Sequence, residues 1–167
     1  MKITKELLKE KGACADGYRD FLKEYPVDKY PDGVEYQELL DFCAEKNFSY
    51  GSWLLDAFGK TDDVRKIEGD LIVEKGIIFA GRLEVKGCIE AGCGIEAGCD
   101  IEAGCDIEAG WGIKAGWGIK AGDEFGIYAG LRCRITNKTQ RKIIAKKRPE
   151  NIMCGEFEEK SDSEGKA

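Results

Sequence analysis

Hydrophobic residues follow two different periods along this chain, and the period changes between residues 60 and 71. In the first part, apolar side chains recur three or four positions apart, a spacing that predicts α-helices packed by one face. Thr4 is a candidate N-cap for the first helix, and Gly12 is a stop signal. We expect three or four short helices in a helical module of residues 1–62, from segments 3–13, 14–26, 31–47 and 50–59.

The second part has a strict six-residue period. The residue two positions after each aliphatic is Val or Phe at first and Ala later, and the residue between them is usually Glu or Lys. Side chains alternate faces in an extended segment, so Ile-Glu-Ala points in, out and in. Gly-Cys-Gly or Gly-Cys-Asp then makes a corner, where glycine tolerates positive φ. The aliphatic positions are Leu71, Ile77, Leu83, Ile89, Ile95, Ile101, Ile107, Ile113 and Ile119.

This period predicts a parallel β-helix over residues 67–155. A hexad is too short to bury a core alone, but stacked coils bury a continuous one. Three flat faces would use about 18 residues per coil, with coils about 4.8 Å apart. The fold class expected is therefore α+β: a small N-terminal helical module followed by a short, three-faced parallel solenoid.

The three-faced arrangement predicts which side chains stack, because residues 18 positions apart become neighbours. Glu96 is expected beside Lys114 and Glu102 beside Lys120, both favourable pairs, whereas Glu90 meets Glu108, a pair of like charges. At the corners, Cys93 is expected beside Trp111 and Cys99 beside Trp117.

Both ends of a β-helix expose strand edges that need covering. The helical module is a natural cap for one end, joined to it through residues 60–66. After Lys120 the period breaks, which predicts wider coils, and segment 151–157 is a candidate last strand over the other end. Residues 156–167 are expected to form a disordered acidic tail.

Composition narrows the possible chemistry. The chain is 43% apolar and 35% charged, as expected for a folded, soluble protein, and it contains no histidine. Because histidine is the commonest general base and a frequent zinc ligand, we expect no enzyme, no catalytic residue, no metal and no cofactor. No apolar run or leader pattern is present, so we expect a cytoplasmic location, reduced cysteines, no membrane association and no small-molecule substrate.

Charge is distributed unevenly, and this is the main clue to partners. Seven acids and one base lie between Glu84 and Glu108, whereas eight bases and no acid lie between Leu131 and Arg148. Carboxylates at regular spacing on a rigid rod can imitate a nucleic-acid backbone. The basic segment is either solvated, a phosphate contact or a surface for the acidic face of a second copy. The residues predicted to bind a partner are Glu90, Glu96, Asp100, Glu102, Asp106, Glu108, Trp111 and Trp117.

Several families carry similar repeats. The runs "GDLIVEKG", "IEAGCDIEAGWGIKAGWGIKAG" and "GIYAGLRCRI" resemble phage and prophage proteins with near-perfect IEAG and IKAG repeats. More distantly, the chain is similar to bactofilins, which polymerise, and to pentapeptide-repeat proteins, some of which mimic DNA. The hexad also resembles hexapeptide-repeat acyltransferases, but that resemblance implies a catalytic histidine, which this chain lacks.

Two functional hypotheses follow. The first is a non-enzymatic protein, phage-encoded if the resemblance holds, that inhibits a host nuclease or CRISPR complex by acidic mimicry in the host cytoplasm. Its partner would be a host protein or a protein–nucleic-acid complex, and a homodimer is compatible with it. The alternative is a self-assembling structural protein of the bactofilin kind, joined through its coil ends or its opposed charges.

Overall fold

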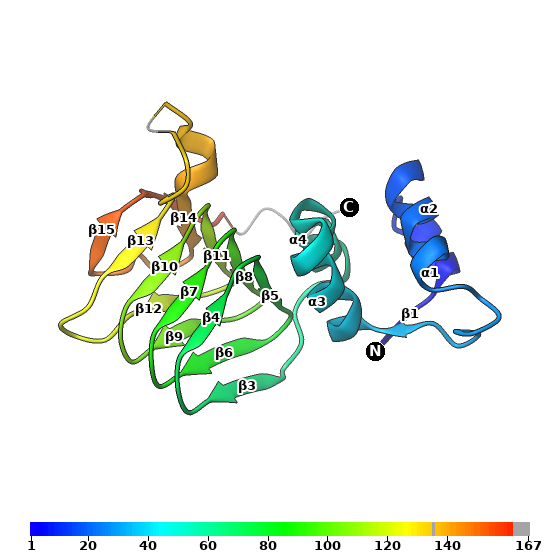
Figure 1. The fold of residues 1–167 in the computed structure, drawn as a ribbon, viewed down its shortest axis with the longest axis horizontal. Helices are drawn as coiled ribbons and strands as arrows, with labels where there is room; N and C mark the ends of the chain where they lie inside the picture. The colour runs from blue at the N-terminus through cyan, green and yellow to red at the C-terminus, as the bar shows by residue number, and fades with distance from the viewer. Residues whose placement is uncertain (135, 162–167) are drawn as a thin grey trace.

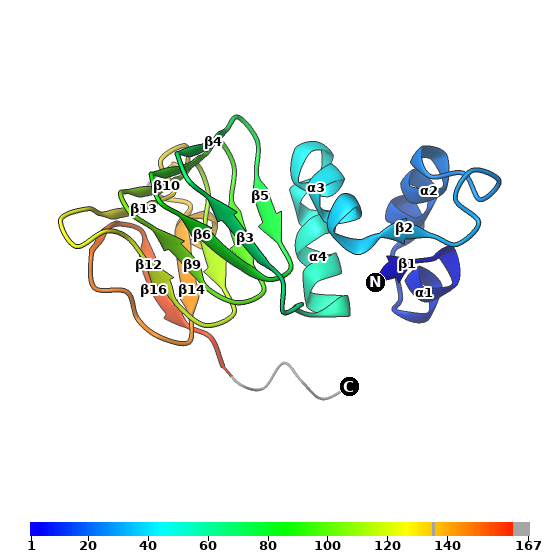
Figure 2. The ribbon, with the colours of Figure 1, turned by 90° about the horizontal axis from the view of Figure 1, so that it is seen from below.

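A computed structural model describes residues 1–134 and 136–161, and it contains the two predicted parts in the predicted order (Figure 1). Four helices precede a parallel β-solenoid of roughly five turns, which confirms the fold class. Helices α3 and α4 lie between the solenoid and the pair α1 and α2 in both side views (Figures 1 and 2). The helices are α1 (Lys5–Glu10), α2 (Ala15–Glu24), α3 (Tyr36–Lys46) and α4 (Phe48–Phe58).

Local signals in the sequence set the helix ends. The Thr4 hydroxyl accepts a hydrogen bond from the Leu7 N–H at 3.3 Å, and the glycines after α1 and α4 adopt positive φ. No pattern in the sequence predicted the short antiparallel pair of strands that joins the N-terminus to the start of α3. Its strands are β1 (Lys2–Ile3) and β2 (Val34–Glu35).

The solenoid has three flat faces, each a parallel sheet. Face 1 has four strands, and faces 2 and 3 have five each. Face 1 comprises β3 (Val64–Ile67), β6 (Arg82–Val85), β9 (Ile101–Ala103) and β12 (Ile119–Lys120). Face 2 comprises β4 (Leu71–Val73), β7 (Ile89–Ala91), β10 (Ile107–Ala109), β13 (Ile127–Ala129) and β15 (Ile152–Cys154). Face 3 comprises β5 (Ile77–Phe79), β8 (Ile95–Ala97), β11 (Ile113–Ala115), β14 (Lys142–Ala145) and β16 (Glu156–Glu159).

The predicted aliphatic stack fills the interior. All nine hexad positions belong to one apolar cluster, and the central ones are fully buried. Strand pairing has the predicted 18-residue step, since Ile95 pairs with Ile113 and Glu96 with Lys114. After Lys120 the coils widen as expected: Ile107 pairs with Ile127, and a short 3₁₀ helix (Lys138–Arg141) precedes β14.

Corner glycines are required for a different reason from the one expected. The glycine that follows each Ile-Glu-Ala triplet has negative φ, so the positive-φ explanation is wrong at these positions. A Cβ on Gly98 or Gly116 would lie 1.9 or 1.8 Å from the carbonyl oxygen of the preceding coil, Ala80 or Gly98. The glycine therefore lets successive coils approach closely at each corner.

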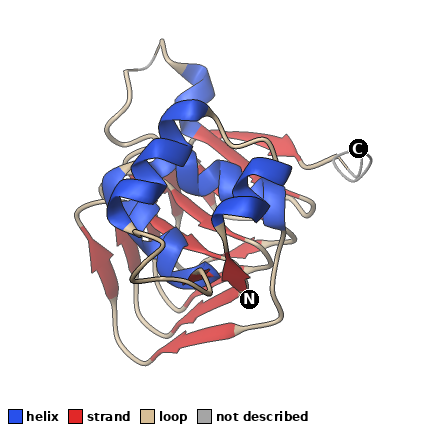
Figure 3. Ribbon diagram, turned by 90° about the vertical axis from the view of Figure 1, so that its right-hand side faces the viewer, coloured by secondary structure: helices blue, strands red, loops and turns tan. Residues whose placement is uncertain are grey.

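The helical module covers the end of the solenoid at β5. The Gln37 side-chain amide donates to the Ile78 carbonyl at 2.9 Å and accepts from the Ala80 N–H at 3.0 Å. In this way α3 satisfies the strand edge much as a further strand would. Figure 3 shows the helices in front of the strands when the molecule is viewed from this end. The outward-facing Ile78 is buried in the apolar core of the module.

Both termini of the solenoid extend further than the sequence indicated. Strand β3 starts at Val64, inside the segment interpreted as a link. Its Arg65 takes an inward position beside Leu83, with its guanidinium 4.6 Å from the Phe79 ring centroid and 3.3 Å from Asp41. Segment 151–157 does not cover the end: it supplies two strands that extend faces 2 and 3, and β16 includes residues placed in the tail. Residues 162–167 of that tail lie outside the described part of the chain.

Candidate binding surfaces

The predicted partner-binding residues do not share one surface. Glu90 and Glu108 lie on face 2, Glu102 on face 1 and Glu96 on face 3, while the aspartates and tryptophans occupy corners between strands. The six-residue period explains this separation, because three successive hexads turn their outward side chains toward three different faces. The acidic stretch is therefore continuous in the sequence but divided in space.

Face 2 keeps two of the predicted carboxylates together. Glu90 and Glu108 are directly paired on adjacent strands, with Ile72 on one side and Tyr128 on the other. Burial raises the pKa of Glu108, and the negative charges of Glu90 and Asp106 raise it further. Among the described residues, neither glutamate has an ion-pair partner within 4.0 Å. Face 2 thus carries a pair of glutamates with no compensating positive charge.

Apolar side chains flank this acidic pair. Ile72 is 63% exposed at one end of face 2, and Met153 is 67% exposed at the other, in β15. Tyr128 lies between Glu108 and the last strand. Exposed aliphatic and aromatic side chains on a flat, hydrogen-bonded face can bury apolar area in a partner. We call the row of Ile72, Glu90, Glu108, Tyr128 and Met153 the face 2 row.

Glu96 is not available to a partner, contrary to its predicted role. Helix α4 packs on face 3 above it, leaving the residue 9% exposed. Its Oε1 accepts a hydrogen bond from the Ser52 hydroxyl at 2.6 Å, and its buried Oε2 has no hydrogen-bond partner in the described structure. Burial raises the pKa of this carboxyl, with partial opposition from Ser52 and Lys114. Lys114, the predicted neighbour, forms an ion pair with Asp56 at 2.7 Å.

Asp100 and Asp106 brace the corners. Each Oδ1 accepts a hydrogen bond from a glycine N–H of the next coil, Gly118 at 3.0 Å and Gly126 at 2.8 Å. Asp70 does the same for Cys88 at 2.8 Å. Side-chain capping of turn amides explains why aspartate occurs at the position before a strand, where other hexads have glycine. These carboxylates hold the coils together, which the sequence pattern alone did not indicate.

Glu102 belongs to a row of mixed charge on face 1. It is paired with Glu84 on one side and Lys120 on the other. Glu84 is itself 3.2 Å from Lys66, one strand further along. The predicted Glu102–Lys120 stacking is thus confirmed. The two adjacent glutamates of face 1 are flanked by a lysine on each side, Lys66 and Lys120.

The two tryptophans replace cysteine at two successive corners, Trp111 between β10 and β11 and Trp117 between β11 and β12, as the stacking predicts. The backbone N–H of Trp111 donates to the Cys93 carbonyl at 3.1 Å, and the backbone N–H of Trp117 donates to the Cys99 carbonyl at 3.2 Å. Trp111 packs edge-on against Phe48 of α4, with ring centroids 6.2 Å apart. Trp117 is 54% exposed, and the Lys146 ammonium lies 5.1 Å above its ring.

The basic segment makes contacts within the chain. Lys138 and Arg141 approach Glu156 at 3.8 and 3.4 Å. Lys142 pairs with Glu158, and the Arg148 guanidinium lies 5.2 Å from the Phe157 ring centroid. Strand β16 therefore compensates much of this charge, a partnership that sequence analysis missed because it assigned residues 156–167 to a tail.

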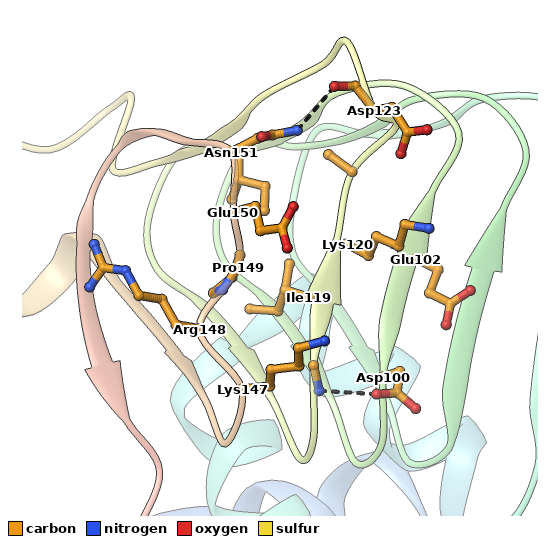
Figure 4. A pocket seen from close by; sticks show the side chains of 13 residues that line it. Asp100, Glu102, Ile119, Lys120, Asp123, Lys147, Arg148, Pro149, Glu150 and Asn151 are labelled. Carbon is orange, nitrogen blue, oxygen red and sulfur yellow. Dashed lines mark hydrogen bonds between the residues drawn. The ribbon is translucent and has the colours of Figure 1, made fainter.

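A cleft of about 440 Å³ lies at the edge of face 1 (Figure 4). Here segment 146–151 runs beside β12 but does not form a fifth strand of face 1. Pro149, which is buried in this segment, has no N–H to donate to a strand ladder. Lys147 still donates its N–H to the Trp117 carbonyl at 3.1 Å, and Asn151 reaches the Asp123 carbonyl at 3.4 Å.

The cleft is highly charged but has a limited chemical repertoire. Its carboxylates and ammonium groups can hold a polar ligand, yet Asp100 is already engaged by Gly118 and Arg82. Among the residues lining it there is no hydroxyl, thiol or imidazole side chain. Across the described parts of the chain, no group of three or more potential ligands is arranged to hold a metal ion. The cleft is lined by Asp100, Glu102, Gly118, Ile119, Lys120, Ala121, Asp123, Ile127, Lys147, Arg148, Pro149, Glu150 and Asn151.

Together these features define a helical module docked on a three-faced parallel β-helix that has one uncovered acidic face. Residues 1–61 match the family described as the YdhT N-terminal domain. That match ends just before β3, so it coincides with the helical module. No curated protein and no solved structure matches the chain. None of the helices in the described residues has the length and apolar character needed to span a membrane.

Proposed function

We propose that this chain is a non-enzymatic binding protein whose face 2 row accepts a basic surface of a macromolecular partner. The observation that carries the proposal is the stacked pair Glu90 and Glu108, which has no compensating cation among the described residues. The neighbouring rows differ from it: on face 1 the stacked pair Glu84 and Glu102 is flanked by Lys66 and Lys120, and α4 covers the start of face 3.

The physical reasoning starts from the spacing of the strands. Adjacent strands place the two carboxylates about 5 Å apart, where like charges destabilise each other. A guanidinium or ammonium group between them removes that repulsion and forms charge-assisted hydrogen bonds. Ile72 and Met153 would bury apolar area on either side of the charged centre and help to exclude water from it.

We propose further that the partner is a nucleic-acid-binding protein or complex of the host, inhibited because carboxylates occupy its basic groove. The resemblance of the repeats to phage proteins supports this narrower proposal, as does the rigidity of a hydrogen-bonded face. Of the six predicted acidic residues, Glu90 and Glu108 carry it. Glu96 is buried, and the two aspartates cap turns. The cytoplasmic location remains a prediction that accompanies this proposal.

The experiment is affinity capture from host lysate followed by titration of the purified partner. E90K/E108K reverses the acidic pair, and D28K/D32K makes the same charge change on exposed residues of the helical module. We expect the wild type and D28K/D32K to bind one partner with affinity that falls as salt rises, and E90K/E108K to lose at least tenfold. Retention of that partner by E90K/E108K would contradict the proposal.

Self-assembly is a second candidate, favoured by the strand edges at both ends. At the first coil, β3 and β4 have no neighbouring strand on their outer side within the described residues, and Val64 is 48% exposed. At the other end β12, β15 and β16 terminate their sheets. Light scattering across chain concentrations distinguishes the two: growth into long assemblies supports this candidate, and a fixed small mass rejects it.

A further inference from the structure

A second possible site lies inside the helical module, away from every surface described above. A pocket of about 270 Å³ opens between the pair α1 and α2 and the pair α3 and α4. Its walls are mostly aliphatic and aromatic side chains. Its lining consists of Leu8, Gly12, Ala13, Cys14, Gly17, Asp20, Phe21, Tyr25, Leu39, Phe42, Cys43, Tyr50, Trp53 and Leu54.

The pocket follows from the way the helices of the module pack. Helix α2 turns one strongly apolar face toward α3 and α4, but only Phe21 and Tyr25 from that face are buried. Tyr25 meets Phe42 edge-on, with ring centroids 5.7 Å apart, so one side of the opening is closed by aromatic contact. Trp53 remains half-buried on the opposite wall. An apolar pocket of this kind gains free energy when a bulky side chain displaces its water.

The rim of the pocket is acidic on the α2 side. Asp16, Asp20 and Glu24 are spaced one helical turn apart and are all exposed. Like charges at this spacing destabilise a helix, and among them only Asp16 has an ion-pair partner in the described chain, Arg19 at 2.9 Å. A cation bound at this rim would relieve the repulsion.

Two tyrosines at the opening lie near different carboxylates. Burial raises the pKa of Tyr50, and so do its neighbours Cys14, Asp20 and Asp16, with partial opposition from Arg19. Burial likewise raises the pKa of Tyr25 to about 12, with smaller effects of Glu38 on α3 and Glu24 on α2. Among the residues that line the pocket Asp20 is the only carboxylate, and Asp16 and Glu24 flank it along α2.

We propose that this pocket binds a basic amphipathic peptide segment of a protein partner, with one bulky apolar side chain inserted between the helix pairs. The lysines or arginines of that segment would contact Asp16, Asp20 and Glu24. Charge complementarity favours this occupant over a free apolar molecule, which would leave the rim repulsion in place, and over an acidic segment.

The test uses a synthetic amphipathic peptide with a central phenylalanine flanked by lysines, and the same peptide with glutamates in their place. Binding to the full chain is followed by fluorescence anisotropy of the labelled peptide. In parallel, ¹H–¹⁵N spectra follow the indole N–H signals. We expect saturable binding of the lysine peptide and a shift of the Trp53 signal, with Trp111 and Trp117 unmoved because they lie on the solenoid.

Matched variants separate the pocket from general electrostatics. Ala13→Phe adds a ring to the pocket wall, whereas Ala13→Ser preserves its size. D16K/D20K reverses the rim, whereas E90K/E108K makes the same charge change on face 2. We expect A13F and D16K/D20K to weaken binding about tenfold, and A13S and E90K/E108K to bind as the wild type does. If A13F fails to fold, D16K/D20K decides the question, since both of its sites are exposed.

Four results would overturn the inference. They are equal binding of the glutamate peptide, equal affinity of A13F and A13S, a Trp53 shift caused only by a small apolar probe such as toluene, and a Trp53 shift produced by self-association without peptide. Because E90K/E108K is here a control, a failure of this inference leaves the proposal for face 2 unaffected, and the reverse also holds.

Discussion

A methyl group placed at Gly116 and, separately, at Gly118 tests the corner packing of the solenoid. The two glycines lie in one hexad on either side of Trp117. A Cβ on Gly116 would lie 1.8 Å from the Gly98 carbonyl oxygen and 2.7 Å from its carbon, both backbone atoms. A Cβ on Gly118 would meet only Asp100 Oδ1 at 3.4 Å, an ordinary contact.

The difference in cost follows from these distances. Real contacts to a Cβ are at least about 3 Å, so Gly116→Ala must push the two coils more than 1 Å apart at this corner. That shift breaks the hydrogen bonds from Gly116 N–H to Ala97 O at 3.1 Å and from Trp117 N–H to Cys99 O at 3.2 Å. Two lost bonds at about 1 kcal/mol each, plus about 1–3 kcal/mol of overpacking, give about 3–5 kcal/mol. Gly118→Ala should change stability by less than about 1 kcal/mol, because its φ is not positive.

Urea unfolding followed by far-UV circular dichroism measures both variants against the wild type. The midpoint of Gly116→Ala should fall well below that of Gly118→Ala with little change in slope. Gly98→Ala repeats the test one coil earlier, where the Cβ would lie 1.9 Å from the Ala80 carbonyl oxygen. Equal midpoints for Gly116→Ala and Gly118→Ala would refute the close-approach explanation.

Three further predictions concern the contacts between module and solenoid and between coils. Glu96 has a folded-state pKa raised by burial, so its favourable contribution is present below its unfolded pKa and is lost as pH rises through the folded value. E96Q should therefore gain stability relative to the wild type between pH 5 and pH 8 and match it at acid pH; a pH-independent difference in urea midpoint would contradict this. Gln37→Ala removes both hydrogen bonds to the β5 edge and should cost about 1–3 kcal/mol, with faster amide exchange at Ala80; unchanged exchange there would show that the edge is held otherwise. Asp106→Ala leaves the Gly126 N–H without its acceptor and should cost about 1–2 kcal/mol in thermal unfolding, while Asp106→Asn keeps an acceptor oxygen and should cost less; a reversed order would argue against the capping role.

Docking of the helices has a direct effect on what the solenoid can bind. Helix α4 covers the outward residues of β5 and β8 and takes Lys114 into an ion pair with Asp56. Face 2 receives no such cover within the described residues, so the outward side chains of its row are exposed or, at Glu108 and Tyr128, half-buried. The module therefore decides which of three similar faces is available to a partner.

Periodicity is the property that sequence alone predicts well in this protein. A repeat of six with alternating apolar positions is compatible with few structures other than a three-faced solenoid, and the same pattern sets the inward stack and the 18-residue pairing. Helix ends were predictable for a similar reason, because Thr4 and Gly12 act through their own backbone neighbours.

Tertiary contacts determined which outward side chains are buried, a property that the periodicity does not predict. Glu90 and Glu96 occupy equivalent places in two IEAGC segments, yet Glu96 is buried by α4 and Glu90 is exposed. Nothing local distinguishes them, because burial depends on which face the helical module packs against. Strand β16 is a second example. Its acidic sequence is typical of a disordered tail, but in the fold its glutamates form ion pairs with Arg141 and Lys142. Local sequence thus determined the coil, and packing between segments distant in sequence determined which of its charges remain exposed to solvent.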